Sequence, residues 1–280
     1  MKLAVFISHL PLSFLYFIAW LVAAFNCYIL RSKRKVIMAN MRRAFPKLTA
    51  AEIGSLCRKY YFVQTEFLVE TIKLLSCKEQ WLQKRAKLIN PEIVNQVDGD
   101  QPILFLSAHQ SNWEWAAQVL FLRFGHPFYG VYKPLRSAKL ERVIFAIRSC
   151  FNGTPLPHRQ FAKTLIKHRA QHSFFYVLSD REPGRRQKSI SLKWLGAQQT
   201  AFYSGTIQLA CAVQCAVFYV RTEKIKKGYY EVSLEPIENK GKGSEQELLA
   251  SYADKLAQGL KKNPENWYWG HPRWRWMKSV

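Results

Sequence analysis

Three short apolar runs separated by helical stretches constrain the fold of this chain more than any other feature. The runs are PILFLSA (102–108), FFYVLSD (174–180) and CAVFYVRTE (215–223), and polar or turn residues bound each of them. Runs of this length are typical of buried strands. The intervening segments with helical patterns lie near residues 111–123, 136–150, 159–171 and 200–213. Strands that alternate with helices predict an α/β domain, with a central sheet flanked by helices.

The segments on either side of these runs complete the predicted fold. Residues 49–90 have helical spacing and begin with Thr49-Ala-Ala-Glu52, a capping-box pattern. Residues 229–237 alternate polar and apolar side chains after a turn at Lys227-Gly228, which indicates a further, half-exposed strand. This late strand predicts that the sheet is mixed. Residues 244–263 have the pattern of an amphipathic helix with a basic last turn.

The N-terminal segment is apolar and uncharged. From Leu3 to Leu30 there is no Asp, Glu, Lys or Arg, and this length is sufficient to span or enter a bilayer core of about 30 Å. The basic segment RSKRKVIMANMRR (31–43) follows, and such flanks favour the cytoplasmic side. We therefore expect residues 1–35 to be a membrane anchor with its basic flank, and residues 36–280 to form a domain in the cytoplasm. A cleaved signal peptide and a buried core helix are the alternatives.

Positive charge is spread along the whole chain. The formal net charge is +23, while 49% of the residues are hydrophobic and 14% are aromatic, which excludes a disordered chain. A folded protein with this surplus attracts nucleic acid, anionic lipid headgroups or an acidic carrier protein. The six cysteines show no CxxC and no zinc-ligand spacing. They indicate reduced, mostly buried thiols of a cytosolic environment and no metal site.

A histidine and a carboxylate follow the first apolar run, in SAHQSNWEW (107–115). A strand that feeds a helix places the residues between them at the carboxyl edge of the sheet, where open α/β folds build their sites. If His109 folds back over the first helical turn, Glu114 can fix the imidazole tautomer and leave the other nitrogen free to accept a proton from an alcohol. This predicts His109 as a general base and Glu114 as its orienting acid. The alternative is structural, because Ser111-x-x-Glu114 is also a capping-box pattern.

The motif SAHQSNWEW resembles the His-x4-Asp/Glu motif of glycerolipid-type acyltransferases, in the version of the lipid A late acyltransferases (lauroyl and myristoyl transferases) of Gram-negative bacteria. Four further segments, in order along the chain, are similar to that family: NMRRAFP (40–46), GVYKPLRSAKLERVIFAIR (130–148), FFYVLSDREPG (174–184) and NPENWYWGHPRWR (263–275). Two positions depart from its pattern. Lys133 stands where many members have arginine, and Pro272 replaces the first arginine after the terminal histidine.

The resemblance implies acyl transfer from an acyl carrier protein thioester to a hydroxyl of a lipid A precursor, an anionic glycolipid, without a metal or cofactor. It implies a catalytic acyltransferase domain over residues 36–280, held at the cytoplasmic face of the inner membrane by the N-terminal helix. A lysophospholipid acyltransferase or another glycolipid acyltransferase would share this chemistry. Nucleic-acid binding and a non-catalytic membrane scaffold are remoter alternatives; the sequence contains no nucleic-acid module motif, and nucleic-acid binding leaves the apolar N-terminus unexplained.

Two further groups of residues are candidates for the site. Arg148, Asp180 and Arg181 are candidates for oxyanion stabilisation or substrate positioning, and surface charge is the alternative for the two arginines. Candidates for contact with lipid phosphates or the carrier protein, with a solvated face as the alternative, are Lys133, Arg185, Arg186, His271 and Arg273. Basic residues in the C-terminal segment alternate with Trp269, Trp274 and Trp276, a pattern that suits a membrane interface.

Overall fold

The central strand of the fold is the first predicted apolar run, now β2 (Ile103–Ser107), which is buried along its whole length. In this computed structural model, which describes residues 1–97, 99–125 and 127–275, it belongs to a seven-stranded sheet in the order β1-β9-β8-β2-β5-β3-β4. The other strands of this sheet are β1 (Ala86–Leu88), β3 (Phe128–Tyr132), β4 (Thr154–Pro157), β5 (Phe174–Leu178), β8 (Ala216–Lys226) and β9 (Tyr229–Ile237). The predicted α/β class is confirmed.

Strand direction confirms the mixed sheet. The pairs β1·β9, β2·β5, β2·β8, β3·β4 and β3·β5 are parallel, whereas β8 and β9 are antiparallel. The predicted turn between them contains Gly228, whose φ of 71° lies in the left-handed region that favours glycine.

A separate antiparallel hairpin consists of β6 (Ser189–Trp194) and β7 (Ala197–Tyr203). It corrects the helix expected over residues 200–213, which begins only at Gly205. Pairing of Phe202 with Ile190 across the hairpin overrides the local helical pattern.

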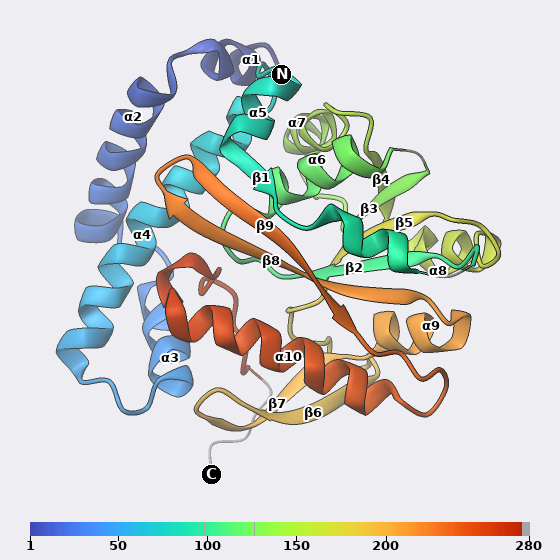
Figure 1. Ribbon diagram of the computed structural model, residues 1–280. Helices are drawn as coiled ribbons and strands as arrows, with labels where there is room; N and C mark the ends of the chain where they lie inside the picture. The colour runs from blue at the N-terminus through green and yellow to red at the C-terminus, as the bar shows by residue number, and fades with distance from the viewer. Residues whose placement is uncertain (98, 126, 276–280) are drawn as a thin grey trace.

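Helices cover both faces of the sheet, as Figure 1 shows. They are α1 (Lys2–His9), α2 (Leu12–Phe25), α3 (Arg34–Ala44), α4 (Ala50–Lys73), α5 (Glu79–Arg85), α6 (Trp113–Phe124), α7 (Ala138–Arg148), α8 (His158–Lys167), α9 (Gly205–Val213) and α10 (Glu245–Lys262). Three short turns of other helix types complete the set: η1 (Asn26–Leu30), η2 (Pro91–Gln96) and η3 (Pro264–Asn266).

Two apolar cores, one on each face of the sheet, hold β2 in place. Ile103 and Phe105 pack with α6 in one core, while Leu104 and Leu106 pack with α10 in the other. This alternation follows from the two-residue period of a strand. Because β2 is hydrogen-bonded between β5 and β8, the loop that follows it starts from a fixed position.

The helix starts test the two predicted capping boxes. At α4 the box is present: Thr49 Oγ1 accepts from Glu52 N, and Glu52 Oε2 accepts from Thr49 N at 2.7 Å. At α6 the predicted box is not formed. Asn112 is the N-cap instead, with its Oδ1 accepting from Trp115 N at 3.0 Å. Ser111 lies outside the helix with a left-handed φ of 53°, which takes its hydroxyl away from the capping position.

The N-terminal helix α2 lies along α4, at the left of Figure 1. Its buried residues Leu15, Ala19 and Ala23 recur every four positions, while Phe17 and Trp20 are 57% and 55% exposed. Residues Leu12–Leu30 have a mean hydropathy of 1.8 and a length sufficient to cross a membrane, and 28% of the apolar window is buried. A buried core helix, one of the alternatives, does not fit this exposure, whereas a signal sequence would pass the same test of length and composition.

Candidate active site

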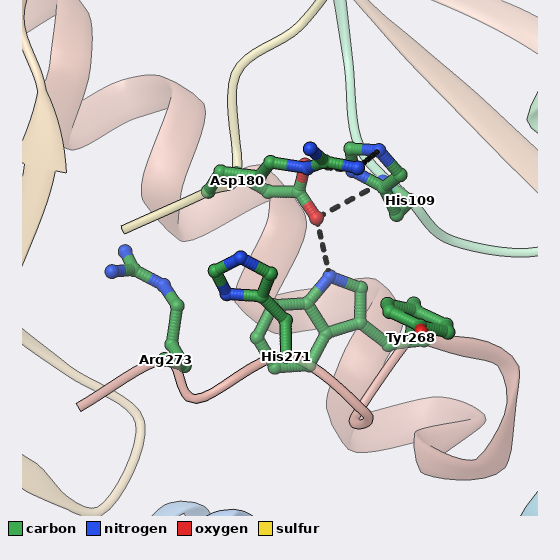
Figure 2. A pocket seen from close by; sticks show the side chains of 7 residues that line it. His109, Asp180, Tyr268, His271 and Arg273 are labelled. Carbon is green, nitrogen blue, oxygen red and sulfur yellow. Dashed lines mark hydrogen bonds and ion pairs between the residues drawn. The ribbon is translucent and has the colours of Figure 1, made fainter. Parts of the chain in front are cut away.

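The ends of two adjacent parallel strands bring His109 and Asp180 together. Ser107 of β2 pairs with Leu178 of β5. His109 lies two positions after Ser107, and Asp180 lies two positions after Leu178. His109 Nδ1 lies 2.7 Å from Asp180 Oδ1, and the His109 backbone N–H donates to Oδ2 at 3.0 Å. Trp267 Nε1 donates to the same Oδ2 at 2.6 Å, as Figure 2 shows by dashed lines around the carboxylate.

The C-terminal segment fixes the other side of the His109 loop. Tyr268 N donates to His109 O at 2.9 Å, and Ser111 N donates to Asn266 O at 2.8 Å. Gln110 forms an isolated antiparallel bridge with Trp267. The segment therefore supplies both a backbone clamp for the loop and the indole that orients Asp180. Sequence reasoning assigned neither role to residues 266–268.

Asp180 carries a negative charge in this arrangement although it is only 3% exposed. Burial by itself raises the pKa of Asp180, but attraction to His109 and hydrogen bonds from His109 and Trp267 outweigh it and hold this pKa well below its usual range. An ionised carboxylate at Nδ1 favours the tautomer with its proton on Nδ1, which leaves Nε2 of the imidazole as an acceptor. Asp180 thus has the geometry of an orienting acid.

The second nitrogen of His109 faces a cation and a small pocket. Arg181 Nη2 lies 3.2 Å from His109 Nε2, and because a guanidinium only donates, this contact fits an accepting Nε2. The Trp113 ring packs edge-on against the imidazole at 5.2 Å between centroids. The pocket is lined by His109, Asp180, Arg181, Trp267, Tyr268, His271 and Arg273.

Glu114 lies beside the site but has a different partner from the one expected. Because α6 begins only at Trp113, Glu114 sits in its first turn and faces Arg148 at the end of α7. Arg148 Nη2 donates to Glu114 Oε1 at 2.6 Å, and Arg148 Nε lies 3.2 Å from both carboxylate oxygens. Burial raises the pKa of Glu114, but the Arg148 charge and the hydrogen bonds from Arg148 and Trp113 together outweigh it, so that the pKa is lowered from its usual value. The structure thus places Asp180, rather than Glu114, at His109 Nδ1.

Two of the predicted phosphate-binding residues are withdrawn from solvent, Arg273 fully and His271 in part. Arg273 is 2% exposed; its Nη1 donates to Ala201 O at 2.6 Å, and its guanidinium lies 4.5 Å from the Phe202 ring centroid. Burial lowers the pKa of Arg273 to about 10. Burial and the nearby Arg181 and His109 lower the pKa of His271 to about 4, so this imidazole is neutral near pH 7.

The aromatic residues of the C-terminal segment correct an expectation. Trp269 and Trp274 are 0% and 4% exposed, and their indole N–H groups donate to Pro264 O and Thr200 Oγ1. The predicted membrane-interface role of these two tryptophans is therefore wrong, because the protein itself supplies their packing and polar partners. Trp276 lies outside the described residues.

The remaining predicted residues lie at the surface. Lys133 is exposed in the loop after β3, and Arg185 and Arg186 are exposed in the loop between β5 and β6. Since β3 and β5 run parallel to β2, these loops leave the same edge of the sheet as His109. Among the residues that the structure describes, no group of three or more His, Cys, Asp or Glu side chains is placed to hold a metal ion.

A histidine with an ionised carboxylate behind it, at the carboxyl edge of an α/β sheet, is an arrangement chemically able to serve as a general base in group transfer. Residues 2–276 match the family profile of the bacterial lipid A biosynthesis acyltransferases, and the chain belongs to this family. The resemblance expected from the motifs is thereby confirmed, and the family indicates an acyltransferase of lipid A biosynthesis. The comparison with curated proteins gave no match.

Proposed function

We propose that this enzyme transfers a fatty acyl chain from an acyl carrier protein thioester to a hydroxyl of a lipid A precursor, with His109 as the general base. The observation that carries the proposal is the 2.7 Å contact between His109 Nδ1 and Asp180 Oδ1. It turns Nε2 of the imidazole toward the pocket as a proton acceptor. Family membership supports the class of acceptor.

The chemical step is a direct displacement on the thioester. His109 Nε2 accepts the proton of the acceptor hydroxyl while that oxygen attacks the thioester carbonyl carbon. The tetrahedral intermediate collapses, the carbon–sulfur bond breaks, and His109 returns the proton to the departing thiolate. A thioester is already an activated acyl donor, so a positioned base that contributes about 10²–10⁴-fold is a sufficient share of the catalysis.

In this proposal Asp180 orients the His109 imidazole, and Glu114 forms an ion pair that holds Arg148. Asp180 holds the Nδ1 proton and stabilises the imidazolium that forms during transfer. Glu114 holds Arg148, whose guanidinium also lies 5.2 Å from the Tyr132 ring centroid. Arg148 would then contact substrate from a fixed position beside the base.

Arg181 is the candidate donor to the oxyanion. Its Nη2 lies 3.2 Å from the nitrogen that the acceptor hydroxyl would approach. When the hydroxyl takes the lone pair of Nε2, the exposed Arg181 side chain can turn to the thioester oxygen, which gains negative charge in the intermediate. The surplus of +23 suits an acidic carrier protein and an acceptor with phosphates. The exposed loops with Lys133, Arg185 and Arg186 are the places where such anions would bind.

We further propose that α2 and its basic flank hold the enzyme at the cytoplasmic face of the inner membrane. Residues 1–35 contain the apolar helix, and Arg31, Lys33, Arg34 and Lys35 follow it directly. Cations beside an apolar helix prefer the anionic cytoplasmic leaflet. In this arrangement residues 36–280 form the catalytic domain, and its acceptor arrives within the same leaflet.

A panel of purified substrates tests the proposal. The acceptors are a tetra- or penta-acylated lipid A precursor, its dephosphorylated form and a lysophospholipid, each offered with acyl carrier protein and coenzyme A donors. We expect the fastest transfer from carrier protein to the phosphorylated precursor, because several Arg and Lys side chains would bind its phosphates. Preference for the lysophospholipid with coenzyme A donor would overturn the acceptor while leaving His109 as the base.

A further inference from the structure

Glu70 is a buried carboxylate outside the active site, to which three other elements donate hydrogen bonds. It lies on α4 and is 0% exposed. Tyr16 Oη of α2 donates to Oε1 at 2.6 Å, and Oε2 accepts from Tyr230 Oη of β9 at 2.6 Å and from Asn112 Nδ2 at 2.8 Å. In the described part of the chain no Lys or Arg forms an ion pair with it. Neutral donors therefore satisfy both oxygens of the Glu70 carboxyl group, and loss of the Tyr16 hydroxyl takes the donor from the buried Oε1.

One of the three donors belongs to the loop that carries the catalytic base. Asn112 is the N-cap of α6, and its Oδ1 accepts from Trp115 N at 3.0 Å while its Nδ2 bonds Glu70. It stands three residues after His109 and two before Glu114. The residue before it, Ser111, has a left-handed φ of 53°. A non-glycine residue keeps such a conformation only where its surroundings fix it, and the Asn112–Glu70 bond is one of the contacts that do so.

A second donor belongs to the N-terminal helix. Tyr16 reaches Glu70 from α2, and Lys227 Nζ lies 5.0 Å from the Tyr16 ring centroid. At the junction of α1 and α2, Ser8 O accepts from Lys73 Nζ at 2.8 Å and from Ser76 Oγ at 2.6 Å. Apolar contacts alone would let two helices slide along each other, whereas these directional bonds fix the position of α2 on α4.

We propose that Glu70 is a positioning residue that couples the seating of α2 on α4 to the loop carrying His109. In this scheme acyl transfer depends on a docked N-terminal helix, and α2 is part of the working enzyme as well as its anchor. When Tyr16 leaves, Glu70 loses the donor at Oε1 and turns toward its remaining donors. Asn112 shifts with it, and the start of α6 moves relative to His109. The inference rests on the proposed function only for its activity readout.

The test compares Tyr16→Phe and Glu70→Gln with Tyr28→Phe in the full-length protein. Tyr28 is 57% exposed on the helical segment that continues α2, so it controls for the loss of a hydroxyl. Amide hydrogen exchange is measured over residues 109–115, and kcat and KM are measured with the substrates above. We expect faster exchange in this loop for both test variants, and a fall in kcat of about tenfold with KM unchanged, the size that follows from loss of one hydrogen bond to a buried carboxylate.

Each outcome has a definite meaning. Faster exchange confined to α2 and α4, with the loop and kcat as in the unmodified protein, overturns the coupling. Faster exchange at residues 109–115 in Tyr28→Phe as well would mean that any change in the N-terminal helix has this effect. That result also overturns the coupling through Glu70. Faster exchange at residues 109–115 in an enzyme that does not acylate any of the three acceptors supports the coupling and rejects the proposed function.

Discussion

Asp180 has the environment of an orienting acid, since it is buried, ionised and bonded to both His109 and Trp267. We predict that Asp180→Asn lowers kcat by about 10²–10⁴-fold, because an amide at Nδ1 no longer favours the productive tautomer. Initial rates of acyl transfer measure the effect, and thermal unfolding checks that the fold is retained. Asp254→Asn, an exposed change on α10, is the control. A rate within about twofold of the control would show that Asp180 does not orient the base.

Substitution of Glu114 should lower stability, whereas Asp180→Asn should keep its fold. Glu114→Gln leaves the Arg148 charge without its partner, so the free energy of unfolding should fall by about 3 kcal/mol. The double variant Glu114→Gln/Arg148→Met should recover part of that stability in chemical denaturation but no activity. If Glu114→Gln keeps its stability and loses all activity while Asp180→Asn stays active, Glu114 is the orienting acid after all.

The lowered pKa of His271 predicts how the stability of the protein changes with pH. Its pKa is about 4 in the folded chain against a usual value of 6.5, so the unfolded chain binds more protons between these values. The free energy of unfolding should therefore decrease as pH falls from 6.5 to about 4. Below pH 4 this group should cause no further change. The effect should be about 1–2 kcal/mol for a half-buried group. His271→Gln should flatten the slope in denaturation curves across this range; an unchanged slope contradicts the assignment.

At the scale of elements, the two faces of α2 should behave independently. Phe17→Glu/Trp20→Glu changes only the exposed face, so we expect weaker binding to lipid vesicles with little change in stability. Ile166→Glu/Ile225→Glu places the same charge on exposed positions of α8 and β8 and serves as the control. Vesicle flotation measures binding. Equal flotation of the two double variants would show that α2 does not contact the bilayer.

The elements that the sequence predicted are those whose apolar pattern is decided locally. Runs such as 102–108 and 174–180 are buried on both faces and carry their own signal. The edge strand β4 contains Pro155 and Pro157, and β1 covers only Ala86–Leu88. Both strands depend on a neighbouring strand for their conformation, so their local sequence does not predict them. The hairpin β6·β7 was missed for the same reason.

The same distinction applies to the site. His109 follows a strand that can be recognised alone, so its place at the sheet edge could be predicted. The partnership with Asp180 requires that β2 and β5 be parallel neighbours in register, which no single segment records. The equal two-residue offset of His109 and Asp180 from their strands was the available signal. Proximity in sequence favoured Glu114 instead, although the start of α6 turns its side chain toward Arg148.

In the molecule as a whole, the proposed anchor and the proposed catalytic domain are packed against each other. α2 lies on α4, α4 carries Glu70, and Glu70 meets the loop between β2 and α6. A boundary at residue 35 therefore separates proposed tasks, membrane attachment and catalysis, across elements that are in contact. An enzyme built in this way would hold its base at a fixed height relative to the bilayer from which its acceptor comes.

Mass spectrometry of lipid A shows whether His109 catalyses acylation of a lipid A precursor. Host cells that lack this protein are supplied with the unmodified chain or with His109→Ala, at matched expression. We expect lipid A heavier by one acyl chain with the unmodified protein, and lipid A identical to that of the deficient cells with His109→Ala. The same added acyl chain in both strains, or in neither, would contradict this role of His109.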